Sequence, residues 1–251
     1  MQIITIANHK GGAAKTTTAL TLADGLRAKD YKVLLIDLDS QCNLSMNCKI
    51  DFDDLQGSSL YDVFNRKADI NYCLFQIFDD LPDFDILSAG LKEIDDIRRI
   101  DEQMLLKALG QLNKKYDFCV IDTPPSLKLA TKMAIKAADY LITPVQPNKF
   151  SLWGIANLFA IAKDLNPRID MFMLITQINP RTKLGEYYLE QYKDISNQAG
   201  ITLFETMISN SVKVPESQHN ETTLFRHSPR CKVSKEYRNF IDEFERSIDH
   251  G

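Results

Sequence analysis

The sequence lacks a long apolar run, and its cysteines lack any regular spacing. No apolar stretch approaches the roughly 20 residues that a helix needs to span a bilayer. The five cysteines include no C-x-x-C pair, and an odd number without a framework is typical of reduced thiols in a cytoplasm. The first residues are too few and too weakly charged to form a signal peptide. These absences predict a soluble, cytoplasmic protein.

A large excess of charge of one sign is also missing. The 34 acidic and 30 basic residues leave a net charge of −4, with a sequence pI near 5.6. This balance excludes a globally basic, histone-like protein but leaves room for a local basic patch. With no internal repeat and no low-complexity linker, the chain is expected to form one domain over residues 1–251. Because the first apolar strand begins at once, we expect no helix-turn-helix domain before it.

Apolar strand patterns alternate with helical patterns along the chain. Strands are expected at 3–7, 32–39, 84–90, 118–122, 140–145, 171–177 and 201–208. Helices are expected at 16–28, 60–64, 71–78, 101–115, 127–138, 151–165, within 185–200 and at 234–248. This alternation predicts an α/β fold: a three-layer sandwich whose central sheet is mostly parallel and flanked by helices.

Residues 8–17 read NHKGGAAKTT and stand between the first strand pattern and the first helical one. A strand that leads into a glycine loop, then Lys-Thr, then a helix is the layout of a phosphate-binding loop. Gly11 and Gly12 let the backbone approach an anion, and the first N–H groups of the helix point at it. Lys15 adds a positive charge near the terminal phosphates, and Thr16 offers a hydroxyl to Mg²⁺.

The loop departs from the pattern G-x-x-x-x-G-K-[ST], because Ala14 replaces the second glycine and Lys10 precedes the glycine pair. It resembles the deviant Walker A loop of the ParA/MinD family of ATPases, usually KGGxGKTT. The resemblance implies the P-loop NTPase fold, ATP and Mg²⁺ as ligands, and Lys10 and Lys15 as catalytic residues. It implies that Lys10 crosses an ATP-sandwiched dimer interface to the partner's nucleotide. The implied nucleotide-binding residues of the loop are Lys10, Gly11, Gly12, Ala13, Ala14, Lys15, Thr16 and Thr17.

Ala14 raises a question of backbone conformation. If this position needs a positive φ, alanine is strained by about 1 kcal/mol or more. If φ is negative there, the methyl group is harmless.

Three carboxylates close two of the expected strands. Asp37 and Asp39 end the second strand, and Asp122 ends the strand 118–122. Ligands of open parallel sheets lie at these strand ends, where Mg²⁺ needs carboxylates and a hydrolytic water needs an acceptor. The segments LIDLDSQCN (35–43) and IDTPP (121–125) resemble the family's two switch regions, usually LIDLDPQGN and IDTPP. The likeness implies that Asp39 orients the attacking water and that Asp37, Asp122 and Thr16 support the metal.

Three later segments resemble the family, and the last two of them are candidates for contact with the base. PVQP at 144–147 resembles a family motif, and Asn179 follows a strand where the family carries an adenine-contacting polar residue. An amide can both donate to and accept from an adenine edge, although Asn-Pro is also a plain turn signal. Residues 212–217 resemble a loop that flanks the base, with Pro215 as the candidate contact.

Residues 223–238 carry five basic side chains against one acid, Glu236. Such a cluster either contacts phosphates without reading sequence or is a solvated face. The candidate DNA contacts are Arg226, Arg230, Lys232 and Lys235.

The resemblance favours a ParA/Soj-type ATPase that partitions DNA. It implies a homodimer formed on ATP binding, non-specific DNA binding at the nucleoid, and stimulation by a ParB-like partner. A MinD-like membrane-surface ATPase is the alternative, but the charges of residues 240–249 are mostly acidic, and we expect the apolar face of this segment to pack on the core. A biosynthetic P-loop enzyme is a further alternative.

Overall fold

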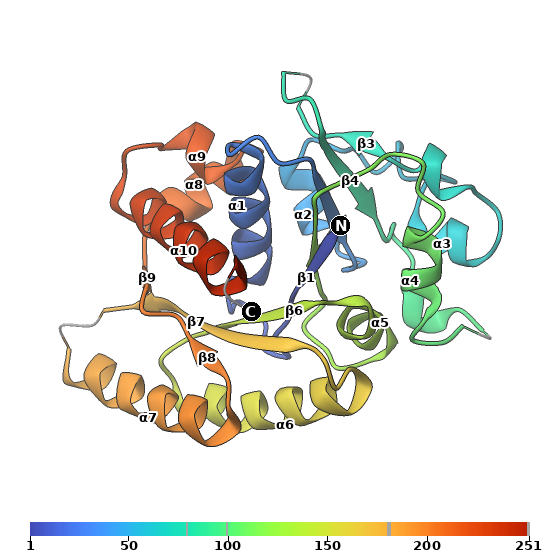
Figure 1. Cartoon of the computed structure of the whole chain (residues 1–251). Helices are drawn as coiled ribbons and strands as arrows, with labels where there is room; N and C mark the ends of the chain where they lie inside the picture. The colour runs from blue at the N-terminus through green and yellow to red at the C-terminus, as the bar shows by residue number, and fades with distance from the viewer. Residues whose placement is uncertain (79, 99, 180–181, 250–251) are drawn as a thin grey trace.

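The computed structural model describes residues 1–78, 80–98, 100–179 and 182–249, and a single sheet runs through it with helices on both faces (Figure 1). The strand order is β3-β4-β2-β5-β1-β6-β7-β8, and β9 also pairs with β7. The strands are β1 (Gln2–Ile6), β2 (Val33–Asp37), β3 (Phe75–Gln76), β4 (Phe84–Ser88), β5 (Phe118–Asp122), β6 (Tyr140–Val145), β7 (Asp170–Ile178), β8 (Thr202–Leu203) and β9 (Ile208–Ser209). Among the described residues, only the β3–β4 pair is antiparallel. The predicted mostly parallel α/β sandwich is therefore confirmed.

The central strands read as continuous apolar runs because both of their faces are buried. Every residue of β2, β4 and β5 is buried, as expected where helices cover the two sides of a parallel sheet. β1 lies in the middle, with β5 on one side and β6 on the other. The strand order thus changes direction at β1, and the crevice at its carboxyl end is where such sheets bind ligands.

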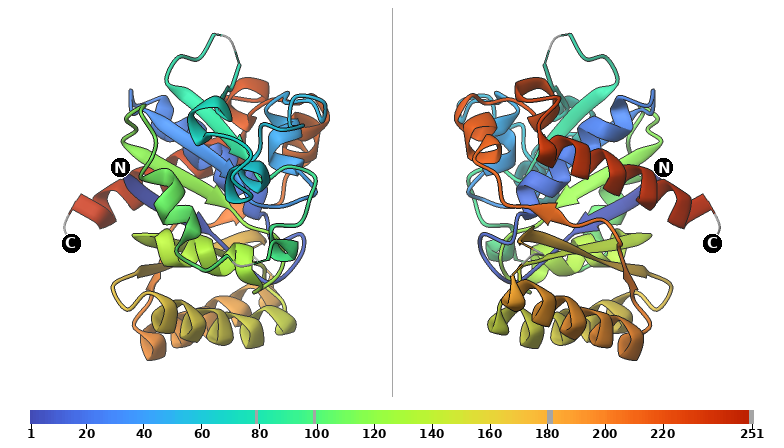
Figure 2. Two further views of the ribbon diagram at one scale, coloured as in Figure 1. Left: turned by 90° about the vertical axis from the view of Figure 1, so that its right-hand side faces the viewer. Right: turned by 90° about the vertical axis from the view of Figure 1, so that its left-hand side faces the viewer.

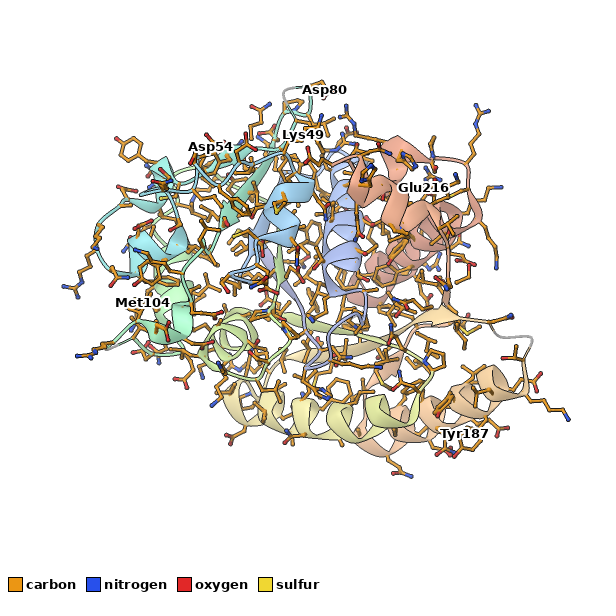
Figure 3. All side chains as sticks on the ribbon, turned by 180° about the vertical axis from the view of Figure 1, so that it is seen from behind. Lys49, Asp54, Asp80, Met104, Tyr187 and Glu216 are labelled. Carbon is orange, nitrogen blue, oxygen red and sulfur yellow. The ribbon has the colours of Figure 1, made fainter. Side chains whose placement is uncertain are left out.

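Two helix layers cover the sheet (Figures 1 and 2). One apolar core joins the sheet to a layer of five helices, namely α1 (Lys15–Arg27), α2 (Asn43–Asn47), α8 (Lys213–His219), α9 (Leu224–His227) and α10 (Lys232–Asp249). The other core lies under α3 (Leu60–Phe64), α4 (Met104–Leu109), α5 (Leu129–Ala137), α6 (Lys149–Leu165) and α7 (Lys183–Ala199). Figure 3 shows the two layers from behind, with Glu216 of α8 and Tyr187 of α7 on opposite sides of the sheet.

The apolar face of α10 packs on the core, as predicted. Phe240 and Phe244 are fully buried, and Ile241 lies against Gly25 of α1. A Cβ added to Gly25 would lie 2.1 Å from Ile241 Cδ1, so the glycine lets the two helices approach closely. The face that a membrane-surface helix would present to lipid is therefore covered by α1 and the sheet.

Three segments differ from their predicted structures. Residues 71–78, predicted as a helix, form a 3-10 turn (Ile70–Tyr72) and then β3, because Phe75 and Gln76 pair with β4. Residues 201–208, predicted as one strand, form β8 and β9, because the N–H groups between them donate to the Glu243 carboxylate of α10. Residues 212–217, predicted as a loop, lie largely within α8.

Candidate functional site

The glycine loop and the first turn of α1 line a cavity of about 330 Å³ at the carboxyl end of β1. Its wall on this side is formed by Gly12, Ala13, Ala14, Lys15, Thr16 and Thr17. In the part of the chain that the structure describes, no side chain caps α1, so its first N–H groups are available to an anion. Most of the predicted loop thus forms part of a cavity wall, with Gly11 and Lys10 outside it. The binding of phosphate there stays a prediction.

Two side chains tie the loop to the end of β6. Asn8 Nδ2 donates to the Pro144 carbonyl oxygen at 2.7 Å, while its Oδ1 accepts from the Lys10 N–H at 3.0 Å. Gln146 Nε2 donates to the Gly12 carbonyl oxygen at 2.6 Å. Because Asn8 is buried, its bond to the Pro144 carbonyl oxygen is shielded from water and holds this side of the loop in place before any ligand arrives.

Ala14 adopts the left-handed conformation, with φ 67° and ψ 26°. Cys42, the N-cap of α2, does the same at φ 52°. These are the two positions where the resembled family patterns have glycine and this chain has another residue. Both replacements thus occupy backbone geometry that favours glycine. The question raised by the sequence is therefore answered: position 14 needs a positive φ, and its methyl group is strained.

We expect Ala14→Gly to stabilise the ligand-free protein by about 0.5–1 kcal/mol, because the relieved strain exceeds the entropy that glycine adds to the unfolded chain. Urea unfolding of the two proteins measures the difference. Ala13→Gly is the matched control: Ala13 is buried and is not among the described residues with positive φ, so its loss should destabilise. An Ala14→Gly variant that is as unstable as Ala13→Gly would contradict the strain argument.

Lys15, which lines the cavity, lies close enough to Asp122 for the two charges to interact. Lys15 is 7% exposed, and its Nζ donates to the Lys10 carbonyl oxygen at 3.3 Å. Burial lowers the pKa of Lys15, against the opposing attraction of Asp122 and Asp39. Burial, together with the nearby Asp37, raises the pKa of Asp122. Both groups are thus poorly solvated, and a ligand that carries both phosphate and a metal cation would compensate both.

The residues at this point fit a magnesium ion. Thr16 Oγ1 donates to Asp122 Oδ2 at 2.6 Å, so the hydroxyl and the carboxylate lie together. Asp122 Oδ1 is buried and has no hydrogen-bond partner among the described residues, which leaves one oxygen for a metal-bound water. The described residues contain no cluster of three or more His, Cys, Asp or Glu side chains. Mg²⁺ needs no such cluster, because it keeps several waters and shares its shell with substrate phosphates.

The two carboxylates after β2 lie in different surroundings. Asp37 is fully buried and accepts from Asp39 N–H and from the N–H and Oγ of Ser45 in α2. Burial raises the pKa of Asp37 to about 6. Asp37 lies beside Asp122 in the β2–β5 pair and is therefore near the proposed metal site. Its oxygens, however, already accept the hydrogen bonds from Asp39 and Ser45. Its role in the metal shell stays a prediction.

Asp39 is half-buried, and its Oδ1 accepts from the Gln41 N–H at 3.0 Å. The second oxygen, Oδ2, forms no hydrogen bond within the ranges that the structure describes. A carboxylate oxygen that is held near Lys15 and still able to accept is what the orientation of a water requires. Its catalytic role stays a prediction.

The far end of the cavity is built from segments distant in sequence. Pro215 lies in its wall, and its contact with a base stays a prediction. The other lining residues are Thr176, Gln177, Ile208, Ser209, Asn210, Ser211, Val214, Gln218 and Tyr237. Asn179 is exposed and is not part of this lining, so its contact with a base stays a prediction; the neighbouring Pro180 and Arg181 lie outside the described residues. The polar run Ser209–Ser211 was not singled out in the sequence, although three polar residues directly after an apolar pair at a strand end were its signal.

The predicted DNA-contacting residues are all exposed, and their surface is formed by α9, the start of α10 and the segment between these helices. Arg226 donates to Asp80 at 3.0 Å and stacks on Phe78, and Lys232 pairs with Glu236 at 3.2 Å. Within the described chain, the side chains of Arg230 and Lys235 form no ion pair or hydrogen bond. We name this surface, Arg226, Arg230, Lys232, Lys235 and Arg238, the α9–α10 basic patch.

Comparison with known families and proteins agrees with this geometry. The sequence profile of a family described as an AAA domain matches residues 1–175. The chromosome partitioning protein ParA of Caulobacter vibrioides is 30% identical over 250 residues, which cover 94% of this chain and 91% of that protein. The sporulation initiation inhibitor protein Soj of Bacillus subtilis is 29% identical, with 96% and 97% coverage.

Solved structures extend the likeness to the fold. A putative plasmid partition protein of Borrelia burgdorferi bound to AMPPNP is 25% identical, with a TM-score of 0.85 over 98% of this chain and 99% of that one. Cobyrinic acid a,c-diamide synthase of Mycobacterium smegmatis with a bound ATP analogue and magnesium is also 25% identical, with a TM-score of 0.81 over 99% and 96%. Among the helices of the described residues, none is long and apolar enough to cross a membrane.

Proposed function

This chain belongs to the ParA/Soj family of partitioning ATPases, and from that premise we propose that it is an Mg-ATP-dependent switch that moves DNA. In this proposal the protein hydrolyses ATP, dimerises around the nucleotide, binds DNA without reading its sequence, and responds to a ParB-like partner. The observation that carries the proposal is the loop itself. Lys15 is buried in the cavity wall beside Thr16, which bonds Asp122, and Lys10 lies on the outer side of the loop.

In this proposal the residues of the loop and the nearby carboxylates have different roles in binding and hydrolysing the nucleotide. The free N–H groups of α1 and the Lys15 ammonium hold the phosphates, and the buried position of Lys15 strengthens its attraction for them. Thr16 and Asp122 would hold the metal, which neutralises charge on the transferred phosphate when it is bound. Asp39 orients the water with its unengaged oxygen. Lys10 supplies a second positive charge from the neighbouring protomer.

Binding of the base is proposed at the far end of the same cavity. Asn210, Ser211 and Gln218 offer polar groups there, and Val214 and Pro215 offer apolar surface for a planar ring. α8, which carries three of these residues, is followed at once by α9 and the basic patch. The nucleotide and the proposed DNA surface are thus joined by one short segment of chain.

DNA binding by the α9–α10 basic patch is expected to depend on Arg230 and Lys235. These side chains are exposed and not engaged with carboxylates among the described residues, whereas Arg226 and Lys232 are held by Asp80 and Glu236. Arg230→Glu with Lys235→Glu should weaken binding of duplex DNA in ATP and lower the slope of log affinity against log salt by about 2, one per lost phosphate contact. A salt titration with ATP and with ADP measures both effects.

The matched control is Arg168→Glu with Lys193→Glu, which changes the net charge equally. Both residues are exposed, and Lys193 lies on α7, in the other helix layer (Figure 1). The control should retain the wild-type salt slope. Equal loss of affinity in both variants would assign binding to net charge and remove the patch from the proposal. DNA binding that is the same in ATP and ADP would contradict the switch.

The membrane-surface alternative finds no support in α10, since its apolar residues are buried against α1 and the sheet. The biosynthetic alternative keeps one supporting observation, the likeness to the cobyrinic acid a,c-diamide synthase. The same DNA titration separates a biosynthetic enzyme from a DNA-partitioning switch, because an enzyme that acts on small molecules is not expected to bind DNA more tightly in ATP.

A further inference from the structure

Lys10 is held on its own protomer by the side chain of Gln146. The Lys10 ammonium donates to Gln146 Oε1 at 3.1 Å, and both residues are half-buried. Gln146 follows directly after β6, and its backbone carbonyl accepts from the Tyr192 hydroxyl of α7. Since Tyr192 is fully buried, the base of the Gln146 side chain is fixed by the core. Gln146 is therefore a rigid anchor for the flexible Lys10 chain.

The orientation of the Gln146 amide follows from its other partners. Nε2 donates to the Gly12 carbonyl oxygen at 2.6 Å and to Gln177 Oε1 at 2.8 Å. Both partners are acceptors, so the NH₂ group must face them and the oxygen must face Lys10. A flipped amide would set NH₂ against the ammonium and oxygen against two oxygens. Both amide hydrogens are thus used, and the oxygen is presented to Lys10.

Gln177 connects this amide to the nucleotide cavity. It lines the cavity, and its Nε2 donates to the same Gly12 carbonyl oxygen at 3.1 Å. Its backbone has φ 54°, at a bulge where the register of β7 against β9 shifts between Thr176 and Ile178. A bulge re-aims a side chain, and here it brings the Gln177 side chain onto the loop. Lys10, Gln146, Gln177 and Gly12 form one hydrogen-bonded group, which we name the Gln146 bridge.

We propose that Gln146 is a positioning residue that retains Lys10 on its own loop in the monomer and releases it when two nucleotide-bound protomers meet. The inference rests on the proposed function, in which Lys10 reaches the partner's phosphates. Lys10 cannot bond Gln146 and cross to another protomer at once, so the bond favours the monomer. A neutral amide holds an ammonium by a single hydrogen bond, which is weaker than an ion pair and can be exchanged for contacts with phosphate.

Two substitutions at position 146 should act in opposite directions. Gln146→Met removes the acceptor on each of the two protomers, and dimerisation in saturating ATP and Mg²⁺ should need about a hundredfold less protein, the combined effect of two hydrogen bonds to a charged group. Gln146→Glu presents a carboxylate to Lys10 and turns the hydrogen bond on each protomer into an ion pair, so dimerisation should need about tenfold more protein, because a carboxylate holds the ammonium more strongly than a neutral amide does. Sedimentation of the full chain over a range of protein concentrations measures both changes.

Nucleotide affinity of the monomer separates positioning from damage to the loop. Gln177 still donates to the Gly12 carbonyl oxygen in both variants, so binding of a fluorescent ATP analogue at low protein concentration should stay within about threefold of wild type. Gln198→Met and Gln198→Glu, at an exposed position of α7, are the matched controls and should change neither measurement.

The outcomes separate the bridge from the switch. Dimerisation that is weakened by both variants, or unchanged in both, would overturn the positioning role of Gln146. The proposed function would not be contradicted in that case, provided that the wild type still dimerises in ATP. A wild type that stays monomeric in ATP would overturn both proposals. Opposite shifts with preserved nucleotide affinity would support the bridge.

Discussion

Lys15→Ala is expected to abolish ATP binding. The ammonium is almost fully buried at the base of the cavity, where burial lowers its pKa and weakens its solvation. Phosphate is the partner that this position lacks, and truncating one member of a buried charge pair costs about 3–5 kcal/mol. The dissociation constant for ATP should therefore rise by roughly 150- to 5,000-fold. Isothermal titration with ATP and Mg²⁺ measures it directly.

Lys10→Ala is the matched control for Lys15→Ala, because it removes the same side chain from the same loop. Lys10 bonds Gln146 and does not line the cavity among the described residues, so the monomer should keep near wild-type ATP affinity. The two lysines then separate binding from dimerisation. An unchanged affinity in Lys15→Ala would place the nucleotide elsewhere on the molecule.

The phosphate end of the site could be predicted from the sequence because its chemistry is local. Lys15 and Thr16 are adjacent in the chain, and a strand, a loop and a helix bring them to one point without help from distant segments. Asp122 needed one further step, the rule that parallel strands end at a common edge. Its hydrogen bond with Thr16, across 106 positions of sequence, follows from that rule.

Apart from Pro215, the far end of the cavity could not be predicted, because it depends on the register of short strands. β9 has two residues, and the bulge at Gln177 places that side chain on the loop. No periodicity marks a two-residue strand or a bulge, so nothing in the sequence singles out Gln177. The Gln146 bridge is likewise invisible in sequence, since it joins three segments through single hydrogen bonds. The strain at Ala14 could be stated as an alternative, but only the backbone angle decides it.

Asp39→Ala is expected to trap an ATP-bound dimer. Loss of the group that orients and accepts from the attacking water lowers hydrolysis by about 10²- to 10⁴-fold, the usual range for a general base. ATP binding should persist, because Lys15, Thr16 and the N–H groups of α1 are unchanged. Size exclusion in ATP should therefore show a dimer that lasts, while the wild type returns to monomer as ATP is consumed.

The neighbouring Ser40→Ala is the control for the trap, because it alters the same loop without touching the carboxylate. Ser40 donates to Glu93 at an exposed position, so its loss should leave hydrolysis and the lifetime of the dimer unchanged. If Asp39→Ala hydrolyses ATP at the wild-type rate, the water is oriented by another group. If it binds ATP and stays monomeric, the site binds nucleotide without acting as a dimer switch, and Lys10 would then have no phosphate to reach.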